Sequence, residues 1–165
     1  MKIHDFIHLR GLAWDYLRRE VKPVICWDPE ERARAVELLG PVGELFRRDM
    51  LEARAPVVLI YLYRQSEQNS LEFCHDGICN IDGLATVREN ERTGAAYSVI
   101  AVAVETLHCP NAEEYAPFVF LHELAHIVGP STKGRHNMKF HTCLDSLIDR
   151  YNKATGSRIE NDYCP

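Results

Sequence analysis

The pattern of apolar and polar positions predicts two helical segments in the first part of the chain. Asp28-Pro29-Glu30-Glu31 has the features of a helix start, because an aspartate can accept from exposed amides, proline fits the first turn and glutamates complement the positive helix end. We expect this helix to run through Leu39 and to be interrupted by Gly40-Pro41. A second amphipathic stretch, residues 42–53, should then form its own helix.

The middle of the chain has the pattern of β-strands. Val57 to Tyr63 is continuous, β-branched and aromatic, which is typical of a strand buried on both faces. After a polar, turn-rich segment from Ser66 to Gly83, two further strands are expected at Leu84 to Arg88 and at Tyr97 to Glu105. Gly94 lies between these two, so the sequence predicts an antiparallel hairpin.

A helical period returns in the last third. Phe118 to Val128 should be helical and should end at Gly129-Pro130, since glycine followed by proline commonly terminates a helix. Two starts stay open for this helix. Asn111 and Glu114 have the spacing of a capping box, whereas Pro117 would break an interior hydrogen bond and favours a start at its own position.

A final helix is expected after Asn137, whose side chain can cap it. Its apolar positions recur at helical spacing and form one core-facing stripe: Phe140, Leu144, Leu147, Ile148 and Tyr151. Helices on both sides of a strand-rich middle segment indicate an α+β fold.

Composition narrows the class of protein. The chain has 165 residues, of which 46% are hydrophobic, enough for a single domain spanning residues 1–165. Its net charge is -5, and basic pairs such as Arg47-Arg48 lie among acidic residues, so we expect no nucleic-acid-binding face. Residues 1–10 lack a continuous apolar run and no later stretch is long enough to cross a membrane. We therefore expect a cytoplasmic protein, with its oligomeric state left open.

The six cysteines contain no Cys-x-x-Cys pair, which removes the commonest thiolate zinc motif. Cys74-His75-Asp76 and Cys79 could form a second metal site with Cys109 or Cys164. The favoured interpretation is a turn with reduced thiols, because the spacing is not that of a standard zinc knuckle.

The candidate chemistry lies in His122-Glu123-Leu124-Ala125-His126. Four residues turn a helix by about 400°, so the two imidazoles project from one face, about 6 Å apart, and can share one cation. Four of the chain's eight histidines fall between residues 122 and 141, which favours a metal site over packed core histidines. Zinc suits these ligands, and a catalytic zinc ion takes three protein ligands and keeps one position open.

The third ligand must come from elsewhere, and His136 and His141 are both candidates. We favour His136, which precedes the predicted cap of the last helix, because His141 aligns with Asp145 at i+4 and is explained by a surface ion pair. Glu123 should take a proton from water as general base and pass it to the leaving amine. Tyr115, Tyr151 and His141 are open alternatives for stabilising the oxyanion.

These motifs resemble those of the SprT-like and WLM metallopeptidases, which combine a histidine-glutamate zinc helix with a downstream His-Gly/Asn-x-x-Phe element. Their third ligand corresponds to His136, and their aromatic core residue to Phe140. The resemblance implies a zincin fold, with a small mixed sheet beside the zinc helix and an edge strand along the substrate cleft. By that likeness the edge strand would be Tyr97 to Glu105, pairing with an extended peptide. The added zinc ribbon or basic character of relatives that act on DNA-crosslinked proteins is missing here.

The sequence thus predicts a zinc metallopeptidase of the HExxH type acting on a protein or peptide substrate. Two other functions stay open. The same chemistry would serve a zinc hydrolase of a non-peptide substrate. A noncatalytic binding module braced by zinc would instead close the metal with a fourth protein ligand, for instance with both His136 and His141.

Overall fold

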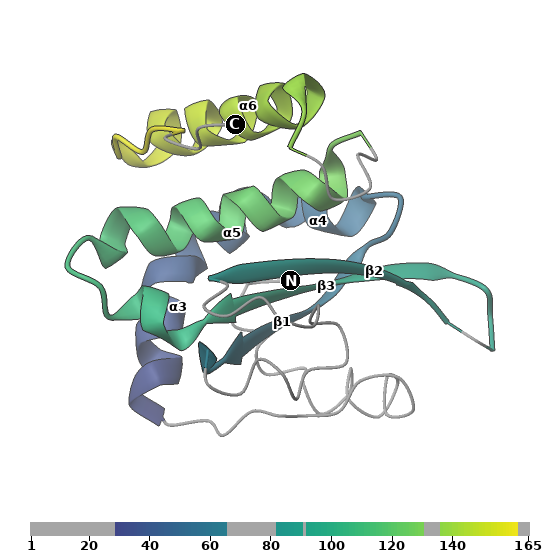
Figure 1. Cartoon of the computed structure of the whole chain (residues 1–165), viewed down its shortest axis with the longest axis horizontal. Helices are drawn as coiled ribbons and strands as arrows, with labels where there is room; N and C mark the ends of the chain where they lie inside the picture. Colours follow the sequence, from purple (N-terminus) through teal and green to yellow (C-terminus); the bar gives the residue numbers. More distant parts are fainter. Residues whose placement is uncertain (1–28, 66–81, 91, 131–135, 162–165) are drawn as a thin grey trace.

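The computed structural model describes residues 29–65, 82–90, 92–130 and 136–161 (Figure 1). These residues form an α+β fold in which helices pack on a small sheet. The elements, in chain order, are α3 (Pro29–Leu45), α4 (Arg47–Glu52), β1 (Val57–Tyr63), β2 (Gly83–Glu89), β3 (Ala96–Ala103), the 3-10 turn η2 (Val104–Leu107), α5 (Ala112–Val128) and α6 (Met138–Thr155). None of these helices is long and apolar enough to cross a membrane.

The sheet is mixed, and β3 is its central strand. β3 pairs in parallel with β1 and antiparallel with β2, giving the order β1-β3-β2. The expected hairpin is confirmed, and its turn contains Gly94 with a φ of 67°, a left-handed conformation that glycine adopts without strain. The expectation that β3 would be the edge strand is wrong. Within the described residues, the edge strand on the α5 side is β2.

The burial of β3 agrees with its central position in the sheet. Val57, Ile60 and Leu62 on β1 are buried in the core, and Tyr63, which follows Leu62, is buried on the opposite face. In β3, every residue from Tyr97 to Ala103 is buried. Consecutive buried residues that face both sides are typical of an interior strand of a sheet. In β2, by contrast, buried and exposed positions are mixed, as expected for an edge strand.

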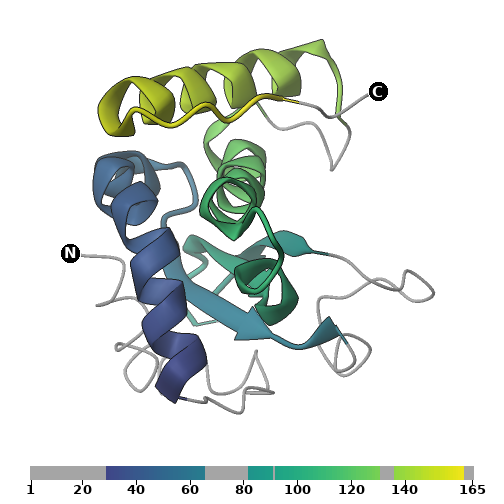
Figure 2. The ribbon, with the colours of Figure 1, turned by 90° about the vertical axis from the view of Figure 1, so that its left-hand side faces the viewer.

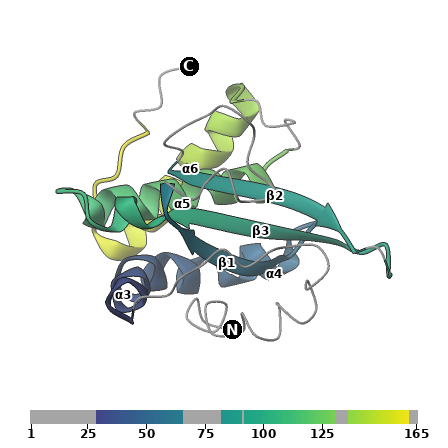
Figure 3. The same cartoon turned by 60° about the horizontal axis from the view of Figure 1, so that its bottom comes forward.

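The helices form layers above the sheet. α5 lies between the sheet and α6 (Figures 1 and 2). Figure 3 shows β2 on the side of the sheet nearest α5 and α6, and β1 on the side of α3 and α4. Because α5 has neighbours on several sides, it is buried around most of its circumference, and the buried residues include His122 and Glu123. His122 and Glu123 therefore lie on an interior helix.

One predicted helix boundary needs correction. Gly40-Pro41 does not end the first helix, since α3 continues to Leu45 with Pro41 inside it. The buried residues around the proline, Leu38, Leu39 and Val42, offset the lost backbone hydrogen bond by burying apolar surface. The break occurs instead at Phe46, where φ is -100° and ψ is 12°.

Of the two starts left open for α5, the structure has the one that follows Asn111, because the helix begins at Ala112 and Pro117 lies inside it. The side chain of Asn111 makes no capping hydrogen bond, and the expected capping box is not formed. The Asn111 carbonyl does accept from the amides of Glu114 and Tyr115, at 3.0 and 2.9 Å, which starts the helix. The predicted end is confirmed, because the helix stops at Val128.

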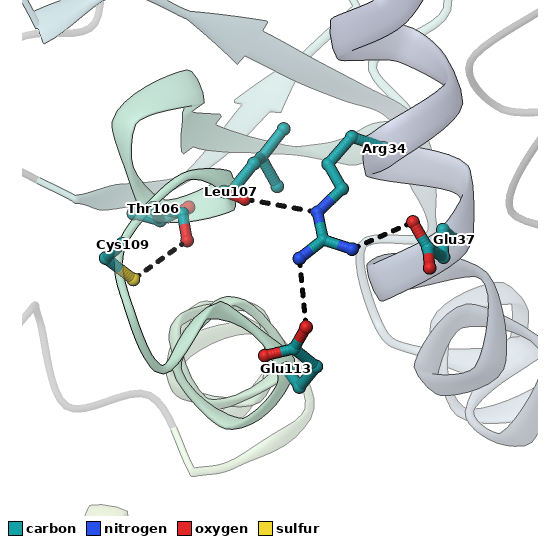
Figure 4. Close-up of polar contacts among 6 residues, drawn as sticks. All are labelled: Arg34, Glu37, Thr106, Leu107, Cys109 and Glu113. Carbon is teal, nitrogen blue, oxygen red and sulfur yellow. Dashed lines mark hydrogen bonds and ion pairs between the residues drawn. The ribbon is translucent and has the colours of Figure 1, made fainter.

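Side-chain contacts tie the start of α5 to its neighbours (Figure 4). The Arg34 guanidinium on α3 donates to the Leu107 carbonyl in η2 at 3.3 Å and to Glu113 on α5 at 3.1 Å. It also donates to Glu37 at 2.8 Å. Exposed ion pairs of this kind contribute little to stability. Here, however, the single Arg34 guanidinium links three elements, α3, η2 and α5.

The last helix agrees closely with its prediction. The Asn137 side chain accepts from the amides of Lys139 and Phe140, at 3.0 and 3.2 Å, and so caps α6. The predicted stripe is buried throughout: Phe140, Leu144, Leu147, Ile148 and Tyr151. After α6, the chain turns back at Gly156, and both the amide and the carbonyl of Ile159 bond to the Asn152 side chain.

Candidate metal centre

Three histidine Nε2 atoms converge at the contact between α5 and α6. His122 and His126 lie one turn apart on α5, and His136 immediately precedes Asn137, the cap of α6. The Nε2 atom of His136 lies 3.0 Å from that of His122 and 3.1 Å from that of His126. Among the described residues, these three are the group of side chains that could hold a metal ion, with ligand atoms all within 4.8 Å of one another.

The spacing of these atoms fits a small divalent ion. Tetrahedral zinc with Zn–N bonds of about 2.0–2.1 Å requires nitrogens about 3.3–3.4 Å apart. The observed 3.0 and 3.1 Å are close to that requirement. The Nε2 atom of His136 can donate at most one proton, so it cannot form good hydrogen bonds to the Nε2 atoms of both His122 and His126. One cation, by contrast, can accept the lone pairs of all three nitrogens. Three imidazoles are also a donor set that zinc accepts.

Phe140 holds the three rings in place. Its ring centroid lies 5.0 Å from that of His122, 4.4 Å from that of His126 and 4.7 Å from that of His136. The Phe140 side chain is itself buried. Because Asn137 sets the start of α6, the Phe140 ring is directed into the group of histidines one turn later. Asn137 and Phe140 therefore determine how His136 meets α5.

Burial keeps the three imidazoles neutral. Desolvation, followed by repulsion from the neighbouring imidazoles, lowers the pKa of His122 to about 3. The same causes lower the pKa of His126 to about 4 and shift the pKa of His136 downward. A neutral imidazole has a free lone pair, and this is the form that binds metal. The site is thus ready to accept a cation at neutral pH.

Glu123 lies on the side of α5 that faces β2. Its side chain is 7% exposed, and its carboxylate accepts a hydrogen bond from the Ala85 amide. Burial raises the pKa of Glu123 to about 8, and the Ala85 amide opposes this rise by favouring the charged form. A cation at the neighbouring imidazoles would favour the ionised carboxylate further.

His141 lies outside the group of three. Its Nδ1 atom is 3.5 Å from the Asn161 side-chain nitrogen, which donates to Asp145 at 2.7 Å. His141 and Asp145, which are four residues apart on α6, are thus connected through the side chain of Asn161, in the segment that follows the helix. Of the two candidates for a third ligand, the structure brings His136 to the other histidines.

The three candidates for oxyanion stabilisation differ in their distance from the histidines. Tyr151 lies thirteen residues after the first residue of α6, a rise of about 20 Å. Tyr115 lies seven residues before His122 and donates its hydroxyl to Asp82, and burial, followed by this bond, raises its pKa. His141 is the only one of the three within a turn of Phe140.

Sequence reasoning missed two residues at the site, Gly83 and Ala85. An ideal Cβ at Gly83 would lie 2.8 Å from both Cγ and Oε1 of Glu123, and the Ala85 amide donates to the same side chain. The local pattern places Gly83 at the end of a turn-rich segment and Ala85 in an ordinary strand. Their role comes from backbone position and from the missing side chain of glycine, which no local pattern reveals. The alternative cysteine site cannot be placed, since Cys74, His75, Asp76, Cys79 and Cys164 lie outside the described residues. Cys109 and Cys143, which are described, are free thiols.

Comparison of the chain with models of protein families, with curated proteins and with solved structures gives no match. What the structure defines is an α+β protein with a three-histidine cluster that could hold a metal ion. Any function must therefore be inferred from the residues around that cluster.

Proposed function

We propose that the chain is a zinc-dependent metallopeptidase with a zincin-like fold, similar to the SprT-like and WLM enzymes. The observation that carries the proposal is the convergence of three Nε2 atoms at α5, the helix that also carries the buried carboxylate of Glu123 one residue after the first histidine. A buried carboxylate beside a metal-binding group is costly unless it has a function or a strong partner. The mixed sheet beside α5 also agrees with the zincin arrangement.

The proposed chemistry divides between the metal and the protein. Bound zinc would act as a Lewis acid, polarising the scissile carbonyl and lowering the pKa of water. His122, His126 and His136 would hold it, leaving one position for water or substrate. An oxygen of Glu123 would accept the proton from the attacking water and deliver it to the nitrogen of the leaving amine. Burial of Glu123 keeps bulk water from competing for that proton.

The outer edge of β2 is the surface that we propose for the peptide. The Ser98 amide on β3 donates to the Pro56 carbonyl, which precedes β1, and so points away from β2. Val87 on β2 lies opposite Ser98, and the two residues are therefore a non-hydrogen-bonded pair of the antiparallel ladder. The Val87 amide therefore points away from β3, and its side chain is 57% exposed. An extended peptide could pair with β2 at this position by adding a strand. At Ala85 the outward amide already binds Glu123, which would place the peptide next to the general base.

Two alternatives compete with this proposal. A zinc hydrolase of a non-peptide substrate would use the same residues but not the β2 edge. A noncatalytic module braced by zinc would require a fourth protein ligand, and the group of three described ligands favours an open position instead. Cys109 and Cys143, the two cysteines among the described residues, are free thiols, which agrees with the cytoplasmic location that we propose.

The proposal is tested by Glu123→Gln, which keeps the size of the side chain but cannot accept the proton as a carboxylate does. We expect one zinc ion per chain in the wild type and in the variant, and cleavage of casein or of the chain itself only in the wild type. The matched control is Glu114→Gln, an exposed glutamate of the same helix, which should leave zinc content and cleavage unchanged. Equal cleavage by the wild type and Glu123→Gln would remove the carboxylate from the mechanism.

A further inference from the structure

Gly83 on β2 has no room for a side chain. An ideal Cβ built there would lie 2.8 Å from both Cγ and Oε1 of Glu123, and 2.7 Å from Cγ1 of Val119. The described glycines with positive φ are Gly94 and Gly156, so the backbone conformation of Gly83 does not require glycine. What requires glycine at this position is the close approach of α5 to the strand.

The space left by the missing Cβ is occupied by the carboxylate of Glu123. In this position the carboxylate reaches the Ala85 amide, two residues further along β2, and accepts its hydrogen bond. A carboxyl group that is 7% exposed needs such a partner, because a buried polar group without one loses the hydrogen bonds that it made to water. The Glu123 carboxylate can accept from the Ala85 amide because this amide points away from β3, toward the free side of β2. The Val87 amide, two residues later, points in the same direction.

We propose that Gly83 and the Ala85 amide are positioning elements for Glu123: the glycine provides the space, and the amide fixes the direction of the carboxylate. The inference rests on the proposed function in assigning Glu123 the part of general base. The contact itself is a property of the chain with or without that function. Neither Gly83 nor Ala85 is a catalytic residue in this proposal, since both act through Glu123.

A methyl group at residue 83 should displace Glu123 more readily than its other neighbours. Val119 is β-branched, buried and limited to few rotamers within α5. β2 is held along its length by β3, from the pair of Gly83 and Val102 to the pair of Glu89 and Ala96. The Glu123 side chain, with three rotatable bonds, gives way at the lowest cost. Its carboxylate would then leave the Ala85 amide.

The first test is amide hydrogen exchange of the metal-free protein, followed by NMR. In the wild type and in Glu123→Gln, which keeps an accepting oxygen, the Ala85 amide should be protected. In Gly83→Ala and in Glu123→Ala it should exchange at least about tenfold faster, while the amides of β3 keep their protection. Val119→Ala removes packing between α5 and β2 without adding an atom near Glu123, and should leave Ala85 protected.

The second test compares the metal-loaded proteins. Gly83→Ala should bind zinc as the wild type does, because the three histidines are untouched. Its kcat should fall by about 100-fold with KM nearly unchanged, the loss expected when a reacting group is displaced by about 1 Å.

The proposal is overturned if Ala85 is as protected in Glu123→Ala as in the wild type, or if Val119→Ala exposes it as much as Gly83→Ala does. The comparison of Glu123→Ala with Glu123→Gln decides the contact even if Gly83→Ala fails to fold. A wild type that cleaves nothing while Ala85 responds as expected would refute the peptidase and leave the contact standing.

Discussion

Replacing His136 with alanine should weaken zinc binding far more than replacing His141. The Nε2 atom of His136 lies 3.0 and 3.1 Å from those of the two histidines on α5, so the variant would leave two ligands from a single helix. His141 is five positions further along and lies outside the group of three. The two variants remove the same kind of side chain from the start of α6, which makes them a matched pair.

The size of the effect follows from the number of ligands. Zinc held by four protein ligands gains about 10–16 kcal/mol, or about 2.5–4 kcal/mol per ligand. Since 1.4 kcal/mol corresponds to a factor of ten, His136→Ala should bind zinc about 100- to 1000-fold more weakly. The metal-free protein should lose little stability, because His136 is only partly buried and precedes the helix.

The affinity can be measured by competition with a chromogenic zinc chelator, and the ligand set by the visible absorption of the cobalt-substituted protein. His141→Ala should bind zinc within about threefold of the wild type, and its cobalt spectrum should be unchanged. If the two variants lose affinity equally, His141 is also a ligand and the three-histidine site is wrong. If only His141→Ala loses affinity, the assignment must be reversed.

Two further predictions concern the β2 edge and the pH dependence of stability. Val87→Pro removes an amide that points away from β3 and leaves the hydrogen bonds between β2 and β3 intact. Peptide cleavage should therefore fall several-fold or more, with zinc content unchanged. Unchanged cleavage would exclude peptide pairing at this edge. The hydrogen bonds from Arg150 to Asp49, at 2.8 and 3.0 Å, hold the pKa of Asp49 below its ordinary value of about 3.9. A lowered folded-state pKa gives stability that is present above the unfolded pKa and lost as pH falls through the folded one. Asp49→Asn should therefore lower the free energy of unfolding at pH 7 by about 1 kcal/mol or less, since the pair is partly exposed. The measurement is urea unfolding at both pH values, and a difference from the wild type that persists unchanged at about pH 2 would contradict the assignment.

Some features of the site could be predicted from local sequence, and others could not. The common face of His122 and His126 follows from helix geometry. The cap at Asn137 and the core position of Phe140 follow from residue type and spacing, and both are present in the structure. The position of Glu123 could not be derived, because it depends on β2, which lies some forty residues earlier in the chain.

The misplaced helix end and the misplaced edge strand have related causes. Gly40-Pro41 is a sound local signal for a helix end, but the apolar residues on either side are buried by the rest of the fold, and α3 continues through it. Strand order has a similar dependence on distant residues. The pattern predicted β1 and the hairpin, yet β3 is central because β1 pairs with its other side, a contact that spans about forty residues.

The sequence by itself determined which segments are helices and strands, and it placed two imidazoles and a carboxylate on one helix. These results depend on spacings of a few residues, and the geometry of helix and strand fixes such spacings. Only the tertiary structure decided that His136 joins the pair, that β2 lies beside α5 and that Gly83 leaves room for Glu123. Those outcomes depend on the packing of distant elements, where the absence of a single Cβ or the order of three strands determines which atoms come into contact.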